Sequence, residues 1–139
     1  MKVLVDTSVW SLALRRSRQS ASASVRELRH LISDHRVEMI GPIRQEVLSG
    51  IRDEVRFRKL EERLAAFPDI PIRTEDYATA ARFFNVCHTK GIQGSNTDFL
   101  ICAVAVHHRL AIFTTDDDFA RFAECLPIAL HEAAPQTIA

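Results

Sequence analysis

The chain has 139 residues and contains 18 Lys and Arg side chains against 18 Asp and Glu, so its formal net charge at pH 7 is zero. A hydrophobic fraction of 47% and a charged fraction of 26% are ordinary for a globular protein and argue against disorder. No apolar run approaches the roughly 18–20 residues that span a bilayer, and Asp6 comes too early for a signal peptide. We therefore expect one cytoplasmic domain over residues 1–132, without membrane contact, followed by a frayed tail at 133–139.

The charge is unevenly distributed along the chain. Residues 1–70 contain 13 Lys and Arg against 10 acids, whereas residues 71–139 contain 5 against 8. The basic excess is densest over residues 9–36, where nearly all the cations are Arg, whose planar guanidinium suits bidentate contact with phosphate. Solvated helix faces with salt bridges are the alternative explanation. The three cysteines have no CxxC spacing and an odd count, which favours a reducing compartment and apolar core positions.

The first half of the chain alternates short apolar runs with helical patterns. Residues 3–5 form a continuous apolar run that is typical of a strand covered on both faces. A short helix is expected from Thr7 or Ser8 to Leu14 and a second after Ser22 or Ser24, with the apolar residues at 25, 28, 31 and 32 on one face. A strand at 37–40 then leads into a helix that begins at Pro42, where the missing N–H costs nothing, and ends at Gly50.

The second half continues the alternation. Apolar residues at 57, 60, 64 and 67 predict a helix from Asp53 that Pro68 stops, followed by an extended piece at 70–72. Helices are expected at 74–90, at 97–109, where residues 99–106 are apolar on all sides, and at 119–125, after a cap by Asp117 or Asp118. Strands are expected at 110–113 and 128–130. This order predicts an α/β fold, a three-layer α/β/α sandwich with a central, mostly parallel sheet.

Four acids stand beside these apolar segments. Asp6 follows the first strand, Asp116 follows the strand at 110–113, Asp98 opens the buried helix, and Glu46 lies one turn into the helix from Pro42. Ligands of open α/β sheets bind at the carboxyl ends of the strands, so parallel pairing would bring these acids to one edge. Each has an ordinary alternative as well: Asp6 could cap the next helix, Asp98 could complement a helix dipole, and Glu46 could be solvated.

Carboxylates that are crowded together repel one another and are costly to desolvate, so such a set needs a counter-cation. All-oxygen sites select hard ions such as Mg²⁺ or Mn²⁺. His107 and His108 are expected at the far end of the buried helix, in contact with solvent or the helix dipole, and not at a zinc site. A carboxylate-held Mg²⁺ most often serves hydrolysis of a phosphate ester, and the chain has no GxSxG, Walker A or GxGxxG motif.

Four blocks of sequence resemble the PIN-domain ribonucleases, and most closely the VapC-type toxins of prokaryotic toxin–antitoxin pairs. They appear in the order of that family and span residues 5–119: VDTSVW at 5–10, EVLSG at 46–50, DFLICAVA at 98–105 and TTDDDF at 114–119. The resemblance implies a PIN-like sandwich, Mg²⁺- or Mn²⁺-dependent endoribonuclease activity, a homodimer, and inhibition by a VapB-type antitoxin.

The resemblance also implies roles for particular residues. Asp6, Glu46, Asp98 and Asp116 match the catalytic acids of the family. Asp6, Asp98 and Asp116 are then the main metal ligands, Glu46 is a ligand or positions the attacking water, and Asp118 could share the metal. Supporting hydroxyl groups that bond these acids are implied for Thr7 or Ser8 and for Thr114. Arg15, Arg16 and Arg18 are candidates to hold the RNA backbone.

Two other classes of function stay open at this point. One is a non-catalytic binding module, PIN-like or receiver-like, although a receiver would need a Lys after its last acidic block, and none is present. The other is a Mg²⁺-dependent phosphatase, although an aspartyl-phosphate mechanism would favour a second acid where Ser8 stands. The apolar face of the helix at 53–67 is predicted either to pack in the core or to meet a dimer partner or an antitoxin.

Overall fold

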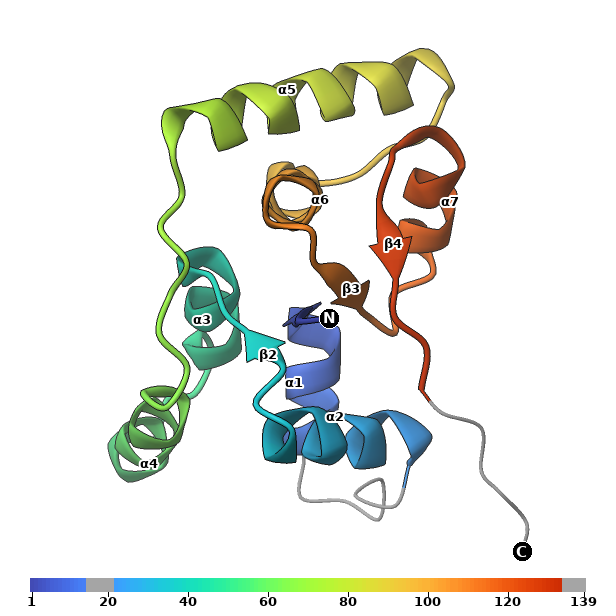
Figure 1. The fold of residues 1–139 in the computed structure, drawn as a ribbon. Coiled ribbons are helices and arrows are strands. Elements are labelled where there is room, and N and C mark those ends of the chain that lie inside the picture. The colour runs from blue at the N-terminus through green and yellow to red at the C-terminus, as the bar shows by residue number, and fades with distance from the viewer. Residues whose placement is uncertain (15–21, 134–139) are drawn as a thin grey trace, which may run out of the picture.

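A four-stranded parallel sheet forms the centre of the fold (Figure 1). The structure is a computed structural model that describes residues 1–14 and 22–133. The strands are β1 (Val3–Val5), β2 (Val37–Glu38), β3 (Ala111–Phe113) and β4 (Ala129–Leu130), and their order across the sheet is β2-β1-β3-β4. Each neighbouring pair is parallel. In Figure 1 the helix pair α5 and α6 lies on one side of the sheet and α1 and α2 lie on the other. The predicted three-layer α/β architecture is therefore confirmed.

The helices follow the sequence patterns closely. Their bounds are α1 (Thr7–Leu14), α2 (Ala23–Ser33), α3 (Gly41–Leu48), α4 (Glu54–Leu64), α5 (Thr74–Thr89), α6 (Asn96–His108) and α7 (Asp118–Cys125). Ser22 caps α2 by accepting a hydrogen bond from the Val25 N–H, as expected of a serine at this position. Gly50 has a φ of 89°, a conformation that favours glycine, just beyond the end of α3.

Two predicted boundaries were wrong in detail. The second strand ends at Glu38, two residues before its predicted end, and Met39 makes only a single parallel bridge to Asp69. Ile32 shares the apolar face of α2 as predicted, but it stands in the last turn and is 36% exposed. The helix from Asp53 ends at Leu64, three residues before Phe67.

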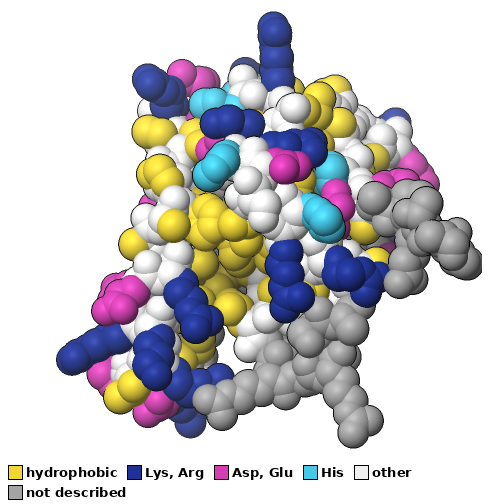
Figure 2. All heavy atoms as spheres, turned by 60° about the horizontal axis from the view of Figure 1, so that its bottom comes forward, with side chains coloured by type: hydrophobic (Ala, Val, Ile, Leu, Met, Phe, Trp, Pro, Cys, Tyr) yellow, Lys and Arg dark blue, Asp and Glu magenta, His cyan; other side chains and the backbone are white. Residues whose placement is uncertain are grey.

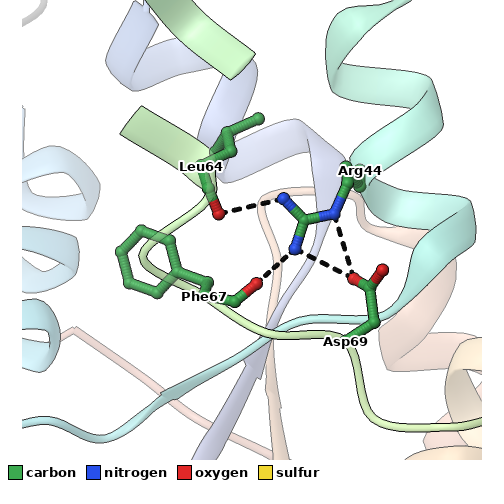
Figure 3. A network of polar contacts seen from close by, with 4 residues as sticks. All are labelled: Arg44, Leu64, Phe67 and Asp69. Carbon is green, nitrogen blue, oxygen red and sulfur yellow. Dashed lines mark hydrogen bonds and ion pairs between the residues drawn. The ribbon is translucent and has the colours of Figure 1, made fainter. Parts of the chain in front are cut away.

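The guanidinium of Arg44 accounts for that early end of α4 (Figure 3). Its Nη1 donates to the carbonyl oxygen of Leu64 at 2.9 Å, its Nη2 donates to the carbonyl oxygen of Phe67, and both Nε and Nη2 contact Asp69. A cation at the carboxyl end of a helix is favourable because the last carbonyl groups there have no partner within the helix. Arg44 thereby ties the end of α4 to α3.

The apolar face of α4 packs in the core. Leu60 and Leu64 are buried in it, and the ring of Phe67 lies edge-on to Trp10 with 5.3 Å between ring centroids. Core packing, one of the two predictions for this face, is therefore confirmed for Leu60 and Leu64.

The helix α6 runs through the middle of the helical layer beneath α5 (Figure 1). Every residue from Phe99 to Ala105 is buried, as the apolar run predicted. His107 was expected to meet solvent or the helix dipole, but its Nδ1 lies 2.5 Å from Oδ1 of the buried Asp76. Its Nε2 lies 3.1 Å from the hydroxyl of Thr79. His107 and His108 are exposed in the last turn of α6, as predicted, and the prediction did not include the pairing of His107 with an acid from α5.

The cysteines occupy the expected apolar positions. Cys87 and Cys102 are buried, Cys125 is half-buried, and all three are free thiols. None of the helices among the described residues is long and apolar enough to cross a membrane. Near the end of the chain, Nε2 of His131 lies 2.5 Å from Oε2 of Glu27, which links the segment after β4 to α2. Most of the tail predicted to fray, residues 134–139, lies outside the described part of the chain.

Candidate active site

Asp6 is the best-buried acid at the carboxyl edge of the sheet. Val5 pairs with Phe113, so the residues that follow them, Asp6 and Thr114, emerge side by side. Oδ2 of Asp6 accepts hydrogen bonds from the hydroxyl of Thr114 at 2.8 Å and from that of Ser8 at 2.9 Å. Only 6% of Asp6 is exposed. These hydroxyl groups fix one oxygen of the carboxylate. Among the described residues, its side chain accepts no hydrogen bond from a helical N–H, and it is the main-chain carbonyl of Asp6 that accepts the first hydrogen bonds of α1.

Asp116 belongs to the same network. Thr114 Oγ1 accepts a hydrogen bond from the Asp116 N–H at 3.0 Å, and Ser8 Oγ accepts one from the Thr115 N–H at 3.0 Å. Oδ1 of Asp116 in turn accepts from the Asp118 N–H at 2.9 Å. Asp117 occupies the N-cap position of α7, as expected, but its side chain makes no cap hydrogen bond, and the carboxylate that bonds the start of α7 is that of Asp116. This turn brings Asp116 to the edge of the sheet that carries Asp6.

Asp98 reaches the edge from the first turn of α6. Its Oδ2 accepts from the Ser95 N–H at 3.1 Å, while its own N–H donates to the Ser95 hydroxyl at 3.1 Å, a reciprocal capping box. Burial raises the pKa of Asp98, the bonds from Ser95 lower it, and the nearby Asp6 and Asp116 carboxylates raise it, leaving it above the usual value. The predicted role at the helix start and proximity to the other acids both hold for this residue.

Glu46 joins the site from α3. Its Oε1 accepts a hydrogen bond from the Thr7 hydroxyl at 3.0 Å, and Glu46 is exposed. Thr7 and Ser8 thus serve two different acids: Thr7 bonds Glu46, and Ser8 bonds Asp6. Because both hydroxyls stand in the first turn of α1, directly after β1, one short segment orients carboxylates from two elements.

The donor set of this edge is chemically suited to a hard cation. The carboxylate oxygens of Asp6, Asp98 and Asp116 are the ligand type that Mg²⁺ and Mn²⁺ prefer. Burial is the main cause of the raised pKa of Asp98, and the Asp6 and Asp116 carboxylates add like-charge repulsion that a divalent ion would relieve. Within residues 1–14 and 22–133, no three Asp, Glu, His or Cys side chains already lie close enough together to hold an ion.

The remaining predicted site residues divide into two groups. Asp118 is half-buried and its carboxylate faces Arg121 at 3.8 Å, so it has a cation of its own in this structure. Arg15, Arg16 and Arg18 lie outside the described residues.

Sequence reasoning did not single out Ser95. Its hydroxyl and N–H hold Asp98 in place. The spacing of Ser95 and Asp98, three residues apart immediately before an apolar run, is the pattern of a capping box and could have identified it.

Comparison with known proteins identifies the family to which the chain belongs. Residues 3–124 match the PIN domain family. Two curated relatives are a VapC ribonuclease of Mycobacterium bovis and ribonuclease VapC11 of Mycobacterium tuberculosis. Each is 31% identical to this chain over 121 residues, which cover 84% of this chain and 88% of the relative.

Solved structures share the fold. FitAcB from Neisseria gonorrhoeae superposes with a TM-score of 0.75 at 23% identity, covering 94% of this chain and 97% of that one. VapBC2 from Rickettsia felis, bound to a DNA fragment from its promoter, gives 0.74 at 17% identity over 94% and 98% of the chains. VapBC-5 from Mycobacterium tuberculosis, of the VapBC family of toxin–antitoxin systems, gives 0.54 at 19% over 94% and 98%. Since the family match spans most of the chain and the VapC relatives share nearly a third of its residues, this protein belongs to the PIN-domain family, with the VapC ribonucleases as its relatives.

Proposed function

We propose that this protein is a divalent metal-dependent endoribonuclease and the toxin of a toxin–antitoxin pair. The observation that carries the proposal is that Asp6 and Asp116 lie near Asp98 at the carboxyl edge of the sheet, where burial and then these two carboxylates raise the pKa of Asp98. The 31% identity to VapC ribonucleases gives the substrate class, RNA. Residues 1–132 form the PIN-like domain in this proposal, and the cytoplasm is its compartment because RNA is there.

Asp6, Asp98 and Asp116 would hold the ion, Mg²⁺ or Mn²⁺, with Glu46 beside them. When bound, such an ion polarises a phosphoryl oxygen and lowers the pKa of water. How many ions bind, and whether Asp118 is also a ligand, depends on the conformation of the turn from Asp116 to Asp118. In this turn the Asp118 N–H donates to the Asp116 carboxylate.

The protein's own groups supply orientation and proton transfer. Ser8 and Thr114 donate to one oxygen of Asp6 and leave the other available. Ser95 restrains Asp98 through its backbone N–H. Glu46 is exposed and held by Thr7, so it is placed to position the attacking water or to accept its proton.

The partners we propose are an RNA substrate, a VapB-type antitoxin and a second copy of the chain. The antitoxin is supported by the fold shared with VapBC-5, a member of a toxin–antitoxin family. Arg15, Arg16 and Arg18 keep their proposed contact with the RNA backbone, since the basic excess of the N-terminal half includes them.

The test incubates the purified protein with structured RNA and Mn²⁺, with EDTA and the Asp98→Asn variant as negative controls. Asp117→Asn is the matched control, because Asp117 is an exposed acid one residue beyond Asp116. We expect internal cleavage of RNA by the unmodified protein and by Asp117→Asn only.

Two results would contradict the proposal in different ways. Hydrolysis of p-nitrophenyl phosphate with intact RNA would make the protein a phosphatase. Absence of both reactions, with RNA still bound, would make it a non-catalytic binding module.

A further inference from the structure

The helix α4 carries a row of cations on one side. Arg56, Lys59 and Arg63 are all exposed, and at 100° per residue they fall within an arc of about 60°. Leu60, which is buried, lies immediately beside this arc. The acids Glu54 and Glu61 fall on the opposite side of the helix. One side of α4 therefore carries three cations, whereas the opposite side carries both signs, with Arg58 beside Glu54.

These three cations flank a hollow with an apolar floor. The hollow has a volume of about 310 Å³ and is lined by Arg56, Lys59 and Arg63 together with three apolar side chains, Leu14, Ile51 and Leu60. Figure 2 shows Lys and Arg side chains gathered on the left of the molecule, where α4 lies, beside a recess with hydrophobic side chains. Cations and an apolar floor together fit an anionic ligand that also carries a flat apolar group.

The positive charge of this row has no internal counter-charge. Across the described residues, none of Arg56, Lys59 and Arg63 forms an ion pair, whereas Arg58 on the other side of α4 pairs with Glu54 at 3.3 Å. Like charges at spacings of three and four residues on a helix repel one another. An external anion would relieve that repulsion.

The hollow lies at the other end of α1 from the candidate active site. Leu14 is the last residue of α1, and Thr7 at the other end of that helix bonds Glu46, about 10 Å away at 1.5 Å per residue. Ile51 follows Glu46 by five residues, just after α3. Arg44 fastens α4 to α3, the helix that carries Glu46, so the hollow keeps a fixed position relative to the acids.

We propose that this hollow is a second contact surface for the RNA substrate. Arg56, Lys59 and Arg63 hold backbone phosphates beside the cleavage site, and the apolar floor contacts a nucleobase. Single-stranded nucleic acid is bound by positively charged grooves in which bases stack on aromatic side chains, and here aliphatic side chains would take that place. The charge of the row is complementary to phosphate, and the position of the hollow at the other end of α1 from the acids favours the molecule that the site acts on. The inference rests on the proposed ribonuclease function.

The test measures binding of a fluorescently labelled single-stranded RNA at several salt concentrations in Mg²⁺. All variants carry Asp98→Asn so that the RNA stays intact. One adds Arg56→Gln, Lys59→Gln and Arg63→Gln. The matched control adds Arg58→Gln, Arg82→Gln and Lys90→Gln, which removes the same charge from other exposed positions. Thermal unfolding verifies that each variant is folded.

The logarithm of the RNA association constant falls as log[salt] rises. We expect the triple substitution on the row to reduce the magnitude of this slope by about 2, since each lost phosphate contact changes it by about 0.7. The control should leave the slope close to that of Asp98→Asn alone. With position 98 unmodified, the triple substitution should raise the KM for RNA cleavage more than it lowers kcat.

An unchanged salt slope in the triple variant would overturn the proposal. An unchanged slope together with lost binding of an oligoglutamate peptide would assign the hollow to an acidic protein partner instead. These outcomes are distinct from failure of the proposed function, in which the unmodified protein leaves RNA uncut in Mn²⁺.

Discussion

Two carboxylates at opposite ends of α6 have contrasting surroundings. Asp76 meets His107 in the last turn, and although burial raises its pKa, the Arg73 N–H and the hydrogen bond and charge of His107 outweigh it and hold the pKa below the usual value. Asp98 stands in the first turn, where burial and two neighbouring carboxylates outweigh its bonds from Ser95 and leave its pKa raised. The charge of Asp76 is balanced by groups within the fold, whereas Asp98 stands near two carboxylates of the same sign.

We interpret Asp76 as an acid that serves stability and Asp98 as one that serves the proposed function. An acid that serves stability acquires donors and cations until its charge is balanced, as Asp76 does. An acid with a perturbed pKa in a group of like charges is typical of a functional site, because the imbalance is resolved only by a ligand. The following substitutions test this distinction.

The largest effect is expected at Asp116. Asp116→Asn removes a proposed metal ligand, and since metal catalysis supplies several kcal/mol, we expect RNA cleavage to fall by at least about 10²-fold. Asp118→Asn, two residues further along, should change the rate little, because Asp118 faces Arg121. Initial rates at saturating Mn²⁺ measure both. An equal loss in the two variants would show that the ion is shared across the turn.

A smaller effect is expected at Thr114, which orients Asp6 without being a proposed ligand. Thr114→Val removes the hydroxyl that donates to Asp6 and accepts from the Asp116 N–H. Residues that orient metal ligands typically contribute 10–100-fold to metal affinity, and we expect the Mn²⁺ concentration for half-maximal activity to rise by about that factor. Thr115→Val, an exposed neighbour, is the control. Normal Mn²⁺ dependence in Thr114→Val would show that Asp6 needs no such support.

Asp76 should behave in the opposite way, affecting stability and not metal dependence. Asp76→Asn is expected to lower the free energy of unfolding by about 2–3 kcal/mol at pH 7. Because the folded pKa of Asp76 lies below its unfolded value, its contribution is complete above the unfolded pKa and is lost as the pH falls through the folded pKa. Urea unfolding at pH 7 and in acid measures the difference between the proteins, which should shrink in acid. A difference that persists in acid would contradict the assignment, and Glu75→Gln is the exposed control.

The smallest effect is expected at Arg44, which is partly exposed. Arg44→Met leaves the carbonyl groups of Leu64 and Phe67 without their donor, and we expect a loss of about 1–2 kcal/mol in unfolding free energy. Arg82→Met removes an exposed cation elsewhere and should leave stability unchanged. An equal loss in both variants would mean that net charge, and not the clamp on α4, is responsible.

Much of the architecture could be predicted because its signals are local. The apolar runs of β1 and β3 and the continuous apolar stretch of α6 depend on neighbouring residues only, and their parallel pairing follows from the alternation of strands and helices. The proximity of Asp6 and Asp116 followed from the rule that parallel strands present their carboxyl ends at one edge, whereas Asp98 reaches that edge from the first turn of α6.

What the sequence did not predict are contacts between segments distant in sequence. His107 meets Asp76 across 31 residues, and Arg44 reaches carbonyl groups 20 and 23 residues away, so neither contact leaves a periodic pattern that sequence reasoning can detect. The cation row on α4 could have been found from its spacing. Its relation to the hollow depends on the packing of α1 and α4 against α3, which the sequence does not show.

The most direct test of the central claim is calorimetric titration of Mn²⁺ into three proteins at pH 7: the unmodified chain, Asp98→Asn and Asp76→Asn. Both substitutions neutralise one carboxylate beside α6 and have the same size. The account predicts that Asp98→Asn weakens Mn²⁺ binding at least about tenfold, whereas folded Asp76→Asn binds like the unmodified chain. Undiminished binding by Asp98→Asn would contradict a metal site at the edge of the sheet.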